Sequence, residues 1–213
     1  MTAKKKTYAR VARLYDFLDL PFEYRRYRPL RRALWRGAKG RVLDAGVGTG
    51  RNIDFYPEKS EITGIDLSSA MLARARARYA SKGAASTVTL KEMDVMETTF
   101  PDDHFDMVVS SFLFCVLDDE HQLPALKELA RITKGNGEIR ILEYAYSKRP
   151  FKRFVMRLWS PWVRMMYGAS FNRKTEQYAI AAGLQLVEER FLFDDIIKML
   201  VLKRPTLKPA ESM

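Results

Sequence analysis

The feature that most constrains this chain is a strand-like run that ends in a glycine-rich turn. Residues 42–45 are apolar except for Asp44, and Gly46, Gly48 and Gly50 follow. Because glycine has no Cβ, the backbone there can turn sharply and approach a ligand closely. In open α/β sheets, ligands bind at the carboxyl ends of the strands. The run therefore predicts the first strand of such a sheet, with a ligand site directly after it.

The spacing of this turn excludes two common phosphate-binding loops. A P-loop requires Lys and then Ser or Thr after its second glycine, whereas Gly50 is followed by Arg51 and Asn52. A dinucleotide-binding loop requires its third glycine at the position of Arg51. Asp44, two residues before Gly46, would repel a pyrophosphate but attracts a ligand that carries an amino group and a sulfonium. The turn therefore predicts S-adenosylmethionine (SAM) as the ligand.

From residue 41 onward, strand-like and helix-like segments alternate along the chain. The expected strands span residues 41–45, 61–66, 87–93, 105–110 and 138–144, and the expected helices span 50–56, 69–81 and 121–133. A further helix ends at Gly183, and two closing strands follow at 184–193 and 196–203. Ser68 or Ser69 can cap the second helix, because a hydroxyl accepts hydrogen bonds from free N–H groups. Such alternation predicts a parallel sheet with helices on both faces.

Two aspartates follow the next strands and extend the expected ligand site. Asp66 ends the second strand, where a carboxylate can accept hydrogen bonds from both ribose hydroxyls of a nucleoside. Asp94 follows the third strand and can accept from an adenine amino group, while Met93 or Val95 packs against the ring. The alternative interpretation is that both are ordinary acids, at a strand end and in a loop. Their place after the glycine turn favours the ligand site.

Taken together, these segments resemble the class I SAM-dependent methyltransferases over roughly residues 40–145. The matching segments are the glycine turn, residues 66–72, Met93 with Asp94, and residues 100–109. The resemblance implies a Rossmann-like, mostly parallel seven-stranded sheet whose last strand is antiparallel. It also implies methyl transfer from SAM, with S-adenosylhomocysteine as the product. The residues expected to bind the cofactor are Asp44, Gly46, Gly48, Gly50, Asp66, Leu67, Met71, Met93, Asp94, Val95 and Ser110.

The charge of the chain is positive at both ends and negative in the middle. The net charge of +11 divides into about +9 for residues 1–40, −5 for 41–147 and +7 for 148–213. Such asymmetry indicates an anionic partner, either a membrane surface or a nucleic acid. DNA and RNA amine methyltransferases usually carry Asn/Asp-Pro-Pro-Tyr/Phe after the fourth strand, whereas this chain has Ser-Ser-Phe-Leu at residues 110–113. The sequence therefore favours the membrane, with nucleic acid as a minor alternative.

An insertion at residues 148–174 strengthens the membrane interpretation. It contains eight Lys or Arg and no acid. Apolar residues recur in it at helical spacing: Phe151, Phe154, Val155, Leu158, Trp159, Trp162, Val163, Met166 and Tyr167. Basic residues lie on the other side, and Pro161 is expected to kink or divide the helix. An interfacial helix has this pattern, and the alternative is a helix packed on the domain's own core.

The domain organisation follows from these boundaries. Residues 1–40 are expected to form basic amphipathic helices, one over 8–20 and a short one through Leu30, Leu34 and Trp35. Residues 41–205 would form the methyltransferase domain, and 206–213 a flexible tail. The start of the chain lacks the pattern of a secretory signal, and no uncharged stretch is long enough to span a bilayer. We expect a cytoplasmic protein, peripheral at the inner face of the membrane, with a monomer favoured.

A metal site is not expected from the composition. The chain has one cysteine, Cys115, and two histidines, His104 and His121, in unrelated surroundings. Structural metal sites need several such ligands at regular spacing. Cys115 lies in an apolar run and is expected to be a small core residue. The chemistry is therefore expected to depend on SAM alone.

Three segments narrow the acceptor. Residues 111–117, 142–144 and 160–162 resemble the peripheral bacterial phospholipid N-methyltransferases and the membrane-associated, methyltransferase-like thiol S-methyltransferases of animals. Quinone-biosynthesis C-methyltransferases look similar over the cofactor half. The leading acceptor is phosphatidylethanolamine; a small lipophilic thiol, amine or phenol is the alternative, and a non-catalytic SAM-binding protein a minor one.

Methyl transfer is an in-line displacement that depends mainly on orientation and electrostatics. Tyr15 is expected to line the transferred methyl group, and Glu143, after the fifth strand, to accept a proton. His121 is a second candidate for the proton acceptor. Each of these residues also has a purely structural interpretation, as packing or as the exposed start of a helix. The sequence therefore leaves the catalytic groups open.

Overall fold

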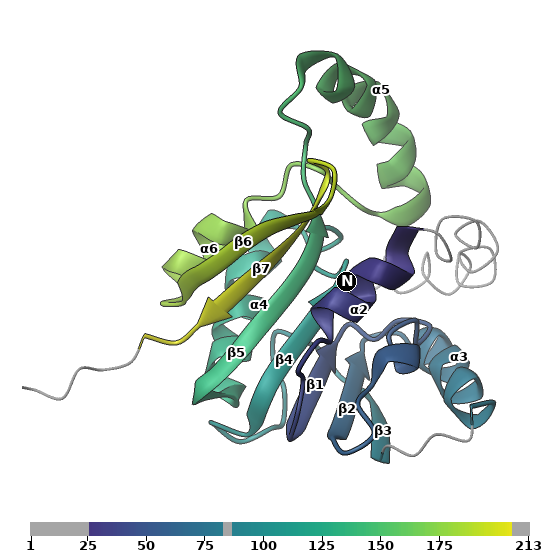
Figure 1. Ribbon diagram of the computed structural model, residues 1–213, viewed down its shortest axis with the longest axis vertical. Coiled ribbons are helices and arrows are strands. Elements are labelled where there is room, and N and C mark those ends of the chain that lie inside the picture. Colours follow the sequence, from purple (N-terminus) through teal and green to yellow (C-terminus); the bar gives the residue numbers. More distant parts are fainter. Residues whose placement is uncertain (1–25, 83–86, 206–213) are drawn as a thin grey trace, which may run out of the picture.

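The protein folds around one seven-stranded sheet, seen in the computed structural model, which describes residues 26–82 and 87–205 (Figure 1). The strands are β1 Arg41–Ala45, β2 Glu61–Asp66, β3 Thr87–Glu92, β4 Phe105–Ser111, β5 Thr133–Tyr144, β6 Gln185–Phe193 and β7 Ile197–Lys203. Their order across the sheet is β3-β2-β1-β4-β5-β7-β6. The first five pair in parallel, and β7 runs antiparallel to both β5 and β6. The expected Rossmann-like, mostly parallel sheet is confirmed.

The helices between the strands lie close to the expected positions. They are α2 Arg28–Leu34, α3 Ser69–Ala80, α4 Asp119–Ile132, α5 Pro150–Tyr167 and α6 Thr175–Ala181. Ser68 caps α3, since its Oγ accepts a hydrogen bond from the backbone N–H of Met71 at 3.4 Å. The expected helix over 8–20, which includes Tyr15, lies outside the described residues.

Two expected boundaries are wrong, each for a local reason. The segment 50–56 contains a short 3-10 helix, Ile53–Phe55, because Gly50 is still in a left-handed conformation (φ 80°). Strand β5 begins at Thr133, five residues before the expected start. Thr133 pairs with Phe105 of β4, so the pairing extends the strand across Gly135 and Gly137.

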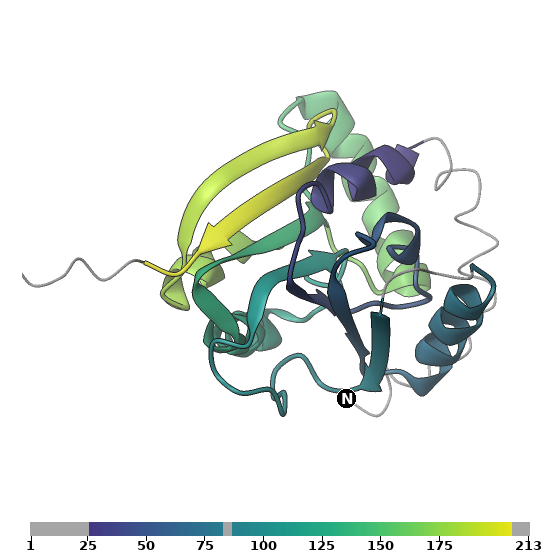
Figure 2. The ribbon, with the colours of Figure 1, turned by 60° about the horizontal axis from the view of Figure 1, so that its bottom comes forward.

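Helices lie on both faces of the sheet, as Figure 2 shows. A hydrophobic core on each face holds them in place. Because side chains alternate along a strand, Val42 and Leu43 of β1 belong to different cores. The core that contains Leu43 packs against α4 and α6, and the core that contains Val42 packs against α2. Leu34 of α2 is fully buried, so α2 shares its core with the sheet. The helices therefore cover both faces, as the alternation predicted.

Helix α5 projects away from the sheet, beyond the edge where the parallel strands end (Figure 1). It begins with Pro150 in its first turn and ends at Gly168, whose φ of 67° places it in the left-handed conformation that terminates helices. Pro161 was expected to kink or divide the helix, and the structure shows that it does not divide it, since the helix is continuous through this residue. A proline removes one backbone hydrogen bond, and this helix continues past that loss.

Candidate active site

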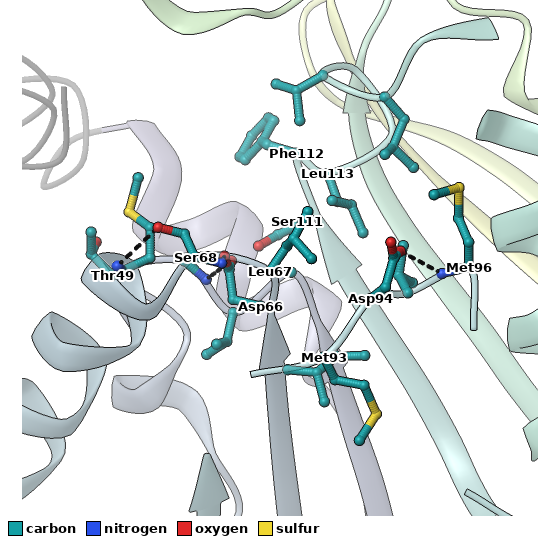
Figure 3. Close-up of a pocket in the computed structure, with 18 of the residues that line it drawn as sticks. Thr49, Asp66, Leu67, Ser68, Met93, Asp94, Met96, Ser111, Phe112 and Leu113 are labelled. Atoms are coloured by element: carbon teal, nitrogen blue, oxygen red, sulfur yellow. Dashed lines mark hydrogen bonds between the residues drawn. The ribbon is translucent and has the colours of Figure 1, made fainter. Parts of the chain in front are cut away.

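A pocket opens at the carboxyl ends of β1, β2 and β4, where the sequence placed the ligand (Figure 3). Its walls come from the glycine turn, the starts of the segments after β2 and β3, and the segment between β4 and α4. Eight of the expected cofactor residues line it: Gly46, Gly48, Asp66, Leu67, Met71, Met93, Asp94 and Val95. The structure therefore brings together residues from three separate parts of the chain.

The glycine turn is held by the next strand. The backbone N–H groups of Gly46 and Val47 donate to the carbonyl of Ile65 at 2.9 Å each. Gly48 has φ of 56°, and a Cβ added to it would meet nothing nearer than a carbonyl oxygen at 4.0 Å. A Cβ on Gly50 would instead collide with Ile53 at 2.6 Å. Gly50, although expected among the cofactor residues, does not line the pocket, and it serves the packing of the turn.

Asp66 joins the end of β2 to the glycine turn. Its Oδ2 accepts a hydrogen bond from the backbone N–H of Gly48, and its Oδ1 accepts one from Ser68, both at 2.9 Å. Burial raises the pKa of this carboxyl. Each carboxylate oxygen can accept more than one hydrogen bond, so Asp66 is suited to receive hydroxyl groups of a ligand in the pocket.

Asp94 lies further along the pocket, after β3. Its Oδ1 accepts from the backbone N–H of Met96 at 3.0 Å, as Figure 3 shows. Met93, Val95 and Met96 give this end of the pocket an apolar lining. A flat ring with an exocyclic amino group fits such a combination of one acceptor and three apolar side chains.

Asp44 does not line the pocket, in contrast to the expectation. It is fully buried, and its two oxygens accept hydrogen bonds from Nδ2 of Asn52 at 3.0 Å. The hydroxyl of Tyr56 donates to it at 2.7 Å. Burial raises the pKa of Asp44 to about 6. Its place is therefore behind the turn, where it holds Asn52 rather than facing a ligand.

Arg31 of α2 is a pocket residue that the sequence analysis missed. Its Nη1 donates to Oδ1 of Asn52 at 2.8 Å and to Oγ of Ser111 at 3.0 Å, and its guanidinium lies over the ring of Phe112. Arg31 and Arg51 are nine-tenths buried and both line the pocket. The pocket lining therefore contains two cations, Arg31 and Arg51, together with the carboxylates of Asp66 and Asp94. In a stretch with many arginines, no sequence pattern distinguishes the one that is buried.

The prediction that Ser110 lines the pocket is off by one residue. Its side chain is fully buried and does not line the pocket, whereas Ser111 does. Because successive side chains of a strand point to opposite faces, a shift of one residue exchanges the pocket for the core. β4 continues to Ser111, which places that residue at the pocket.

The candidate catalytic residues differ in their position relative to the pocket. Tyr15 lies outside the described residues. Glu143 is fully buried, does not line the pocket, and accepts a hydrogen bond from Oγ1 of Thr175 at 2.7 Å. Lys198 is ion-paired with it at 3.6 Å, and burial raises the pKa of Glu143 to about 7. Glu143 is therefore not placed to take a proton from a ligand in the pocket, whereas His121 lines it.

Cys115 is buried, as expected, and its thiol donates to the carbonyl of Phe112 at 3.0 Å. Burial raises the pKa of this thiol far above its ordinary value, so it is protonated at neutral pH. Within the described residues there is no group of three His, Cys, Asp or Glu side chains that could hold a metal ion.

Comparison with known proteins identifies the family. Residues 42–137 match the family described as "Methyltransferase domain". The phosphatidylethanolamine N-methyltransferase of Cereibacter sphaeroides is 38% identical over 152 residues, which cover 70% of this chain and 72% of that relative. The chain is a class I SAM-dependent methyltransferase.

Other relatives of this methyltransferase agree on the fold. The ubiquinone/menaquinone biosynthesis C-methyltransferase of Shewanella woodyi is 27% identical over 180 residues, covering 81% of this chain and 71% of the relative. The crystal structure of geranyl diphosphate C-methyltransferase from Streptomyces coelicolor, in complex with S-adenosyl-L-homocysteine, has a TM-score of 0.69. It is 14% identical and covers 85% of this chain and 82% of that one. The methyl donor of the methyltransferase is SAM.

Proposed function

We propose that this methyltransferase transfers the methyl group of SAM to the amino group of phosphatidylethanolamine at an anionic membrane surface. The protein would act as a peripheral enzyme at the cytoplasmic face. The observation that carries the proposal is the exposed apolar face of α5. The 38% identity to a phosphatidylethanolamine N-methyltransferase supports the choice of acceptor.

The chemistry of the pocket lining fits SAM. In this proposal Asp66 accepts the ribose hydroxyls and Asp94 accepts the adenine amino group. Arg31, beside the glycine turn, attracts the carboxylate of the methionyl part, because a guanidinium binds carboxylates strongly. The aromatic side chain of Phe112 also lines the pocket and adds to its apolar wall.

The face of α5 is more apolar and more exposed than a domain surface usually is. Its exposed large side chains are Phe151, Phe154, Val155, Leu158, Trp159 and Trp162. Phe151 is 80% exposed and Leu158 71% exposed. The alternative in which this face packs on the domain's own core is therefore not what the structure shows. A contiguous exposed apolar patch of this kind is typical of a contact with a membrane or a partner.

Charge favours the membrane over another protein. α5 contains no acid, and Arg153, Arg157 and Arg164 on it are exposed. Lys152 differs from these, since it forms ion pairs with Asp194 and Asp195 in the turn between β6 and β7. Exposed cations beside aromatic side chains suit anionic headgroups above acyl chains.

Both ends of α5 are tied to the domain, which fixes the helix relative to the pocket. At the N-terminal end, Lys152 bonds to the β6–β7 turn as described. Beyond the C-terminal end, the backbone N–H of Ser170 donates to the carbonyl of Cys115 at 2.8 Å, in the segment that lines the pocket. Within the described residues, no helix is long and apolar enough to cross a bilayer.

The proton of the acceptor also needs a destination. A primary ammonium cannot attack the methyl group, so the amine must lose a proton before or during transfer. We propose His121, at the start of α4, as the acceptor of this proton, because it lines the pocket and a ring nitrogen of a neutral imidazole can accept a proton. Most of the rate enhancement then comes from holding the neutral amine in line with the sulfonium.

A test uses methyl-labelled SAM and three acceptors in parallel. These are vesicles of phosphatidylethanolamine with phosphatidylglycerol, matched vesicles in which phosphatidylcholine replaces phosphatidylethanolamine, and a panel of small thiols and phenols. We expect label to enter phosphatidylethanolamine and not the matched lipid. Label that enters a thiol or a phenol, with none in phosphatidylethanolamine, would overturn the proposed acceptor.

A further inference from the structure

The segment between β4 and α4, residues 112–117, forms the pocket wall that faces the glycine turn. Phe112, Leu113, Val116 and Leu117 line the pocket. Leu113 packs directly over the turn, since a Cβ added to Gly46 would lie 3.1 Å from it. Phe112 has φ of 58°, a conformation that is unfavourable for a residue other than glycine. A wall with this conformation needs support from outside the pocket.

Gln122 supplies that support from the interior. It is fully buried on α4, one residue after His121. Its Nε2 donates to the carbonyl of Phe114 at 2.7 Å and to that of Leu117 at 3.1 Å. One amide group thus satisfies two backbone acceptors of the wall. Buried carbonyls left without a donor would be costly, so these bonds fix the wall in place.

A second contact sets the orientation of Gln122. Oγ1 of Thr175, at the start of α6, lies 3.3 Å from Oε1 of Gln122 and 2.7 Å from Oε2 of Glu143. The hydroxyl has one proton, which points mainly at Glu143 and reaches Oε1 of Gln122 as the longer branch of a shared hydrogen bond. This contact favours the orientation in which the amide oxygen faces Thr175 and the nitrogen faces the wall. Thr175 and Glu143 are themselves fully buried, and Lys198 of β7 is ion-paired with Glu143. The contacts therefore run from β5 and β7 through α6 and α4 to the pocket.

We infer that Gln122 is a positioning residue for methyl transfer, oriented by Thr175 and Glu143. It holds residues 112–117 where Leu113 and Phe112 confine the transferred methyl group and the acceptor. This assigns Glu143 a role behind the pocket in place of proton transfer within it. The inference needs methyl transfer, but it does not depend on which acceptor is used.

The experiment compares two substitutions of Thr175. Thr175→Val removes the hydroxyl and keeps the shape, whereas Thr175→Ser keeps the hydroxyl. Turnover of phosphatidylethanolamine vesicles, SAM affinity by calorimetry and thermal unfolding are measured for each. We expect kcat to fall about tenfold in Thr175→Val, the effect of one lost hydrogen bond, with SAM affinity within about twofold of wild type. Thr175→Ser should restore kcat.

Gln122→Leu gives an independent variant, and hydrogen exchange gives a readout that needs no acceptor. The amides of Val116 and Leu117, which donate to the carbonyl of Leu113, should exchange faster in Gln122→Leu and Thr175→Val but not in Thr175→Ser. Unchanged kcat in both folded variants, or faster exchange spread equally over the sheet, would overturn the inference. If wild type does not methylate phosphatidylethanolamine while the exchange result holds, the proposed acceptor fails and the inference stands.

Discussion

The glycine-turn side of the pocket and helix α5 are stabilised in opposite ways. Around the turn, polar groups find partners inside the domain: Asp66 accepts two backbone hydrogen bonds and Asp44 is enclosed by Asn52 and Tyr56. On α5, apolar side chains such as Phe151 are exposed to water. The first region is complete before any ligand binds, whereas the second gains stability when something apolar covers it.

This difference separates two properties that a single activity assay would combine. A preorganised cofactor site binds SAM without the membrane, because its donors and acceptors are already in position. An exposed apolar helix contributes to association and leaves cofactor affinity unchanged. Substitutions around the glycine turn should therefore change SAM affinity, and substitutions on α5 should change vesicle binding. A substitution in one region that changed the other region's measurement would contradict this separation.

The largest expected effect is that of Gly48→Val. Its φ of 56° is in the left-handed region, and the new side chain would enter the pocket that Gly48 lines. We expect SAM binding measured by calorimetry to be lost. The matched control is Gly183→Val, which has φ of 80° and open space around its Cβ. Both variants carry a backbone penalty of about 1–2 kcal/mol, but the control should bind SAM normally.

Normal SAM affinity in Gly48→Val would remove the glycine turn from the cofactor site. Gly50→Val is not a useful substitute, since its Cβ would collide with Ile53 and press on the backbone of Ala75, so the turn and α3 would have to shift. The pair of Gly48 and Gly183 therefore separates obstruction of the pocket from strain in the backbone.

Asp66→Asn is expected to have the next largest effect. Its shape is retained, but one acceptor oxygen and the negative charge are lost. Hydrogen bonds to charged groups contribute about 1.5–3 kcal/mol, so the Kd for SAM should rise roughly ten- to hundred-fold. Sedimentation with anionic vesicles should not change. An unaltered Kd in a folded variant would mean that the ribose of SAM does not bind at Asp66. A change in sedimentation would mean that the cofactor site and α5 do not act independently.

The sequence predicted the cofactor side better than any other part of the site. The glycine turn and Asp66 are both specified locally, because each follows a short apolar strand and strand ends meet at one edge of a sheet. The prediction that Ser110 lines the pocket was wrong because β4 ends one residue later than expected, at Ser111. A shift of one residue exchanges the side chain that lines the pocket for one that is buried in the core. Arg31 could not be found, because its burial depends on how α2 packs against the sheet.

Glu143 shows the limit of the same rule. It lies near the end of β5, as a catalytic acid would, but its side chain meets Thr175 of α6 rather than the pocket. Position at a strand end is encoded in the sequence, whereas the face and the partner depend on tertiary packing. For α5 the periodicity predicted the helix, and the structure was needed to show that its apolar face is exposed.

Replacing Arg153 and Arg157 with Gln sharpens the comparison from the membrane side. Both are exposed, whereas Lys152 is left unchanged because its ion pairs with Asp194 and Asp195 anchor the helix. Each cation near an anionic surface contributes about 1 kcal/mol, so vesicle partitioning should weaken roughly thirty-fold. Higher salt should weaken wild-type binding in the same direction.

The control for this double variant removes the same charge elsewhere. Lys59 and Lys127 are exposed and lie outside α5, so replacing both with Gln should leave partitioning nearly unchanged. SAM affinity should be unaffected in both double variants. Equal partitioning of the Arg and Lys variants would mean that α5 does not meet the membrane.

The smallest expected effect concerns Glu143, the buried acid near the end of β5. Burial raises the pKa of Glu143 from 4.5 to about 7, although Lys198 lies beside it and lowers it in part. Other charged or titratable groups around this pair are Glu176, Glu189, Lys148 and the Cys115 thiol. A raised pKa means that the folded state binds this proton more tightly than the unfolded state. The free energy of unfolding should therefore fall as the pH rises from about 4.5 to about 7.

Glu143→Gln removes this titration, so urea unfolding should show a flatter pH dependence in the variant. The raised pKa of Asp44 makes the free energy of unfolding fall with pH in the same way in wild type and in Glu143→Gln. Subtracting one pH profile from the other removes this contribution. Identical slopes would show that Glu143 keeps its ordinary pKa in the fold.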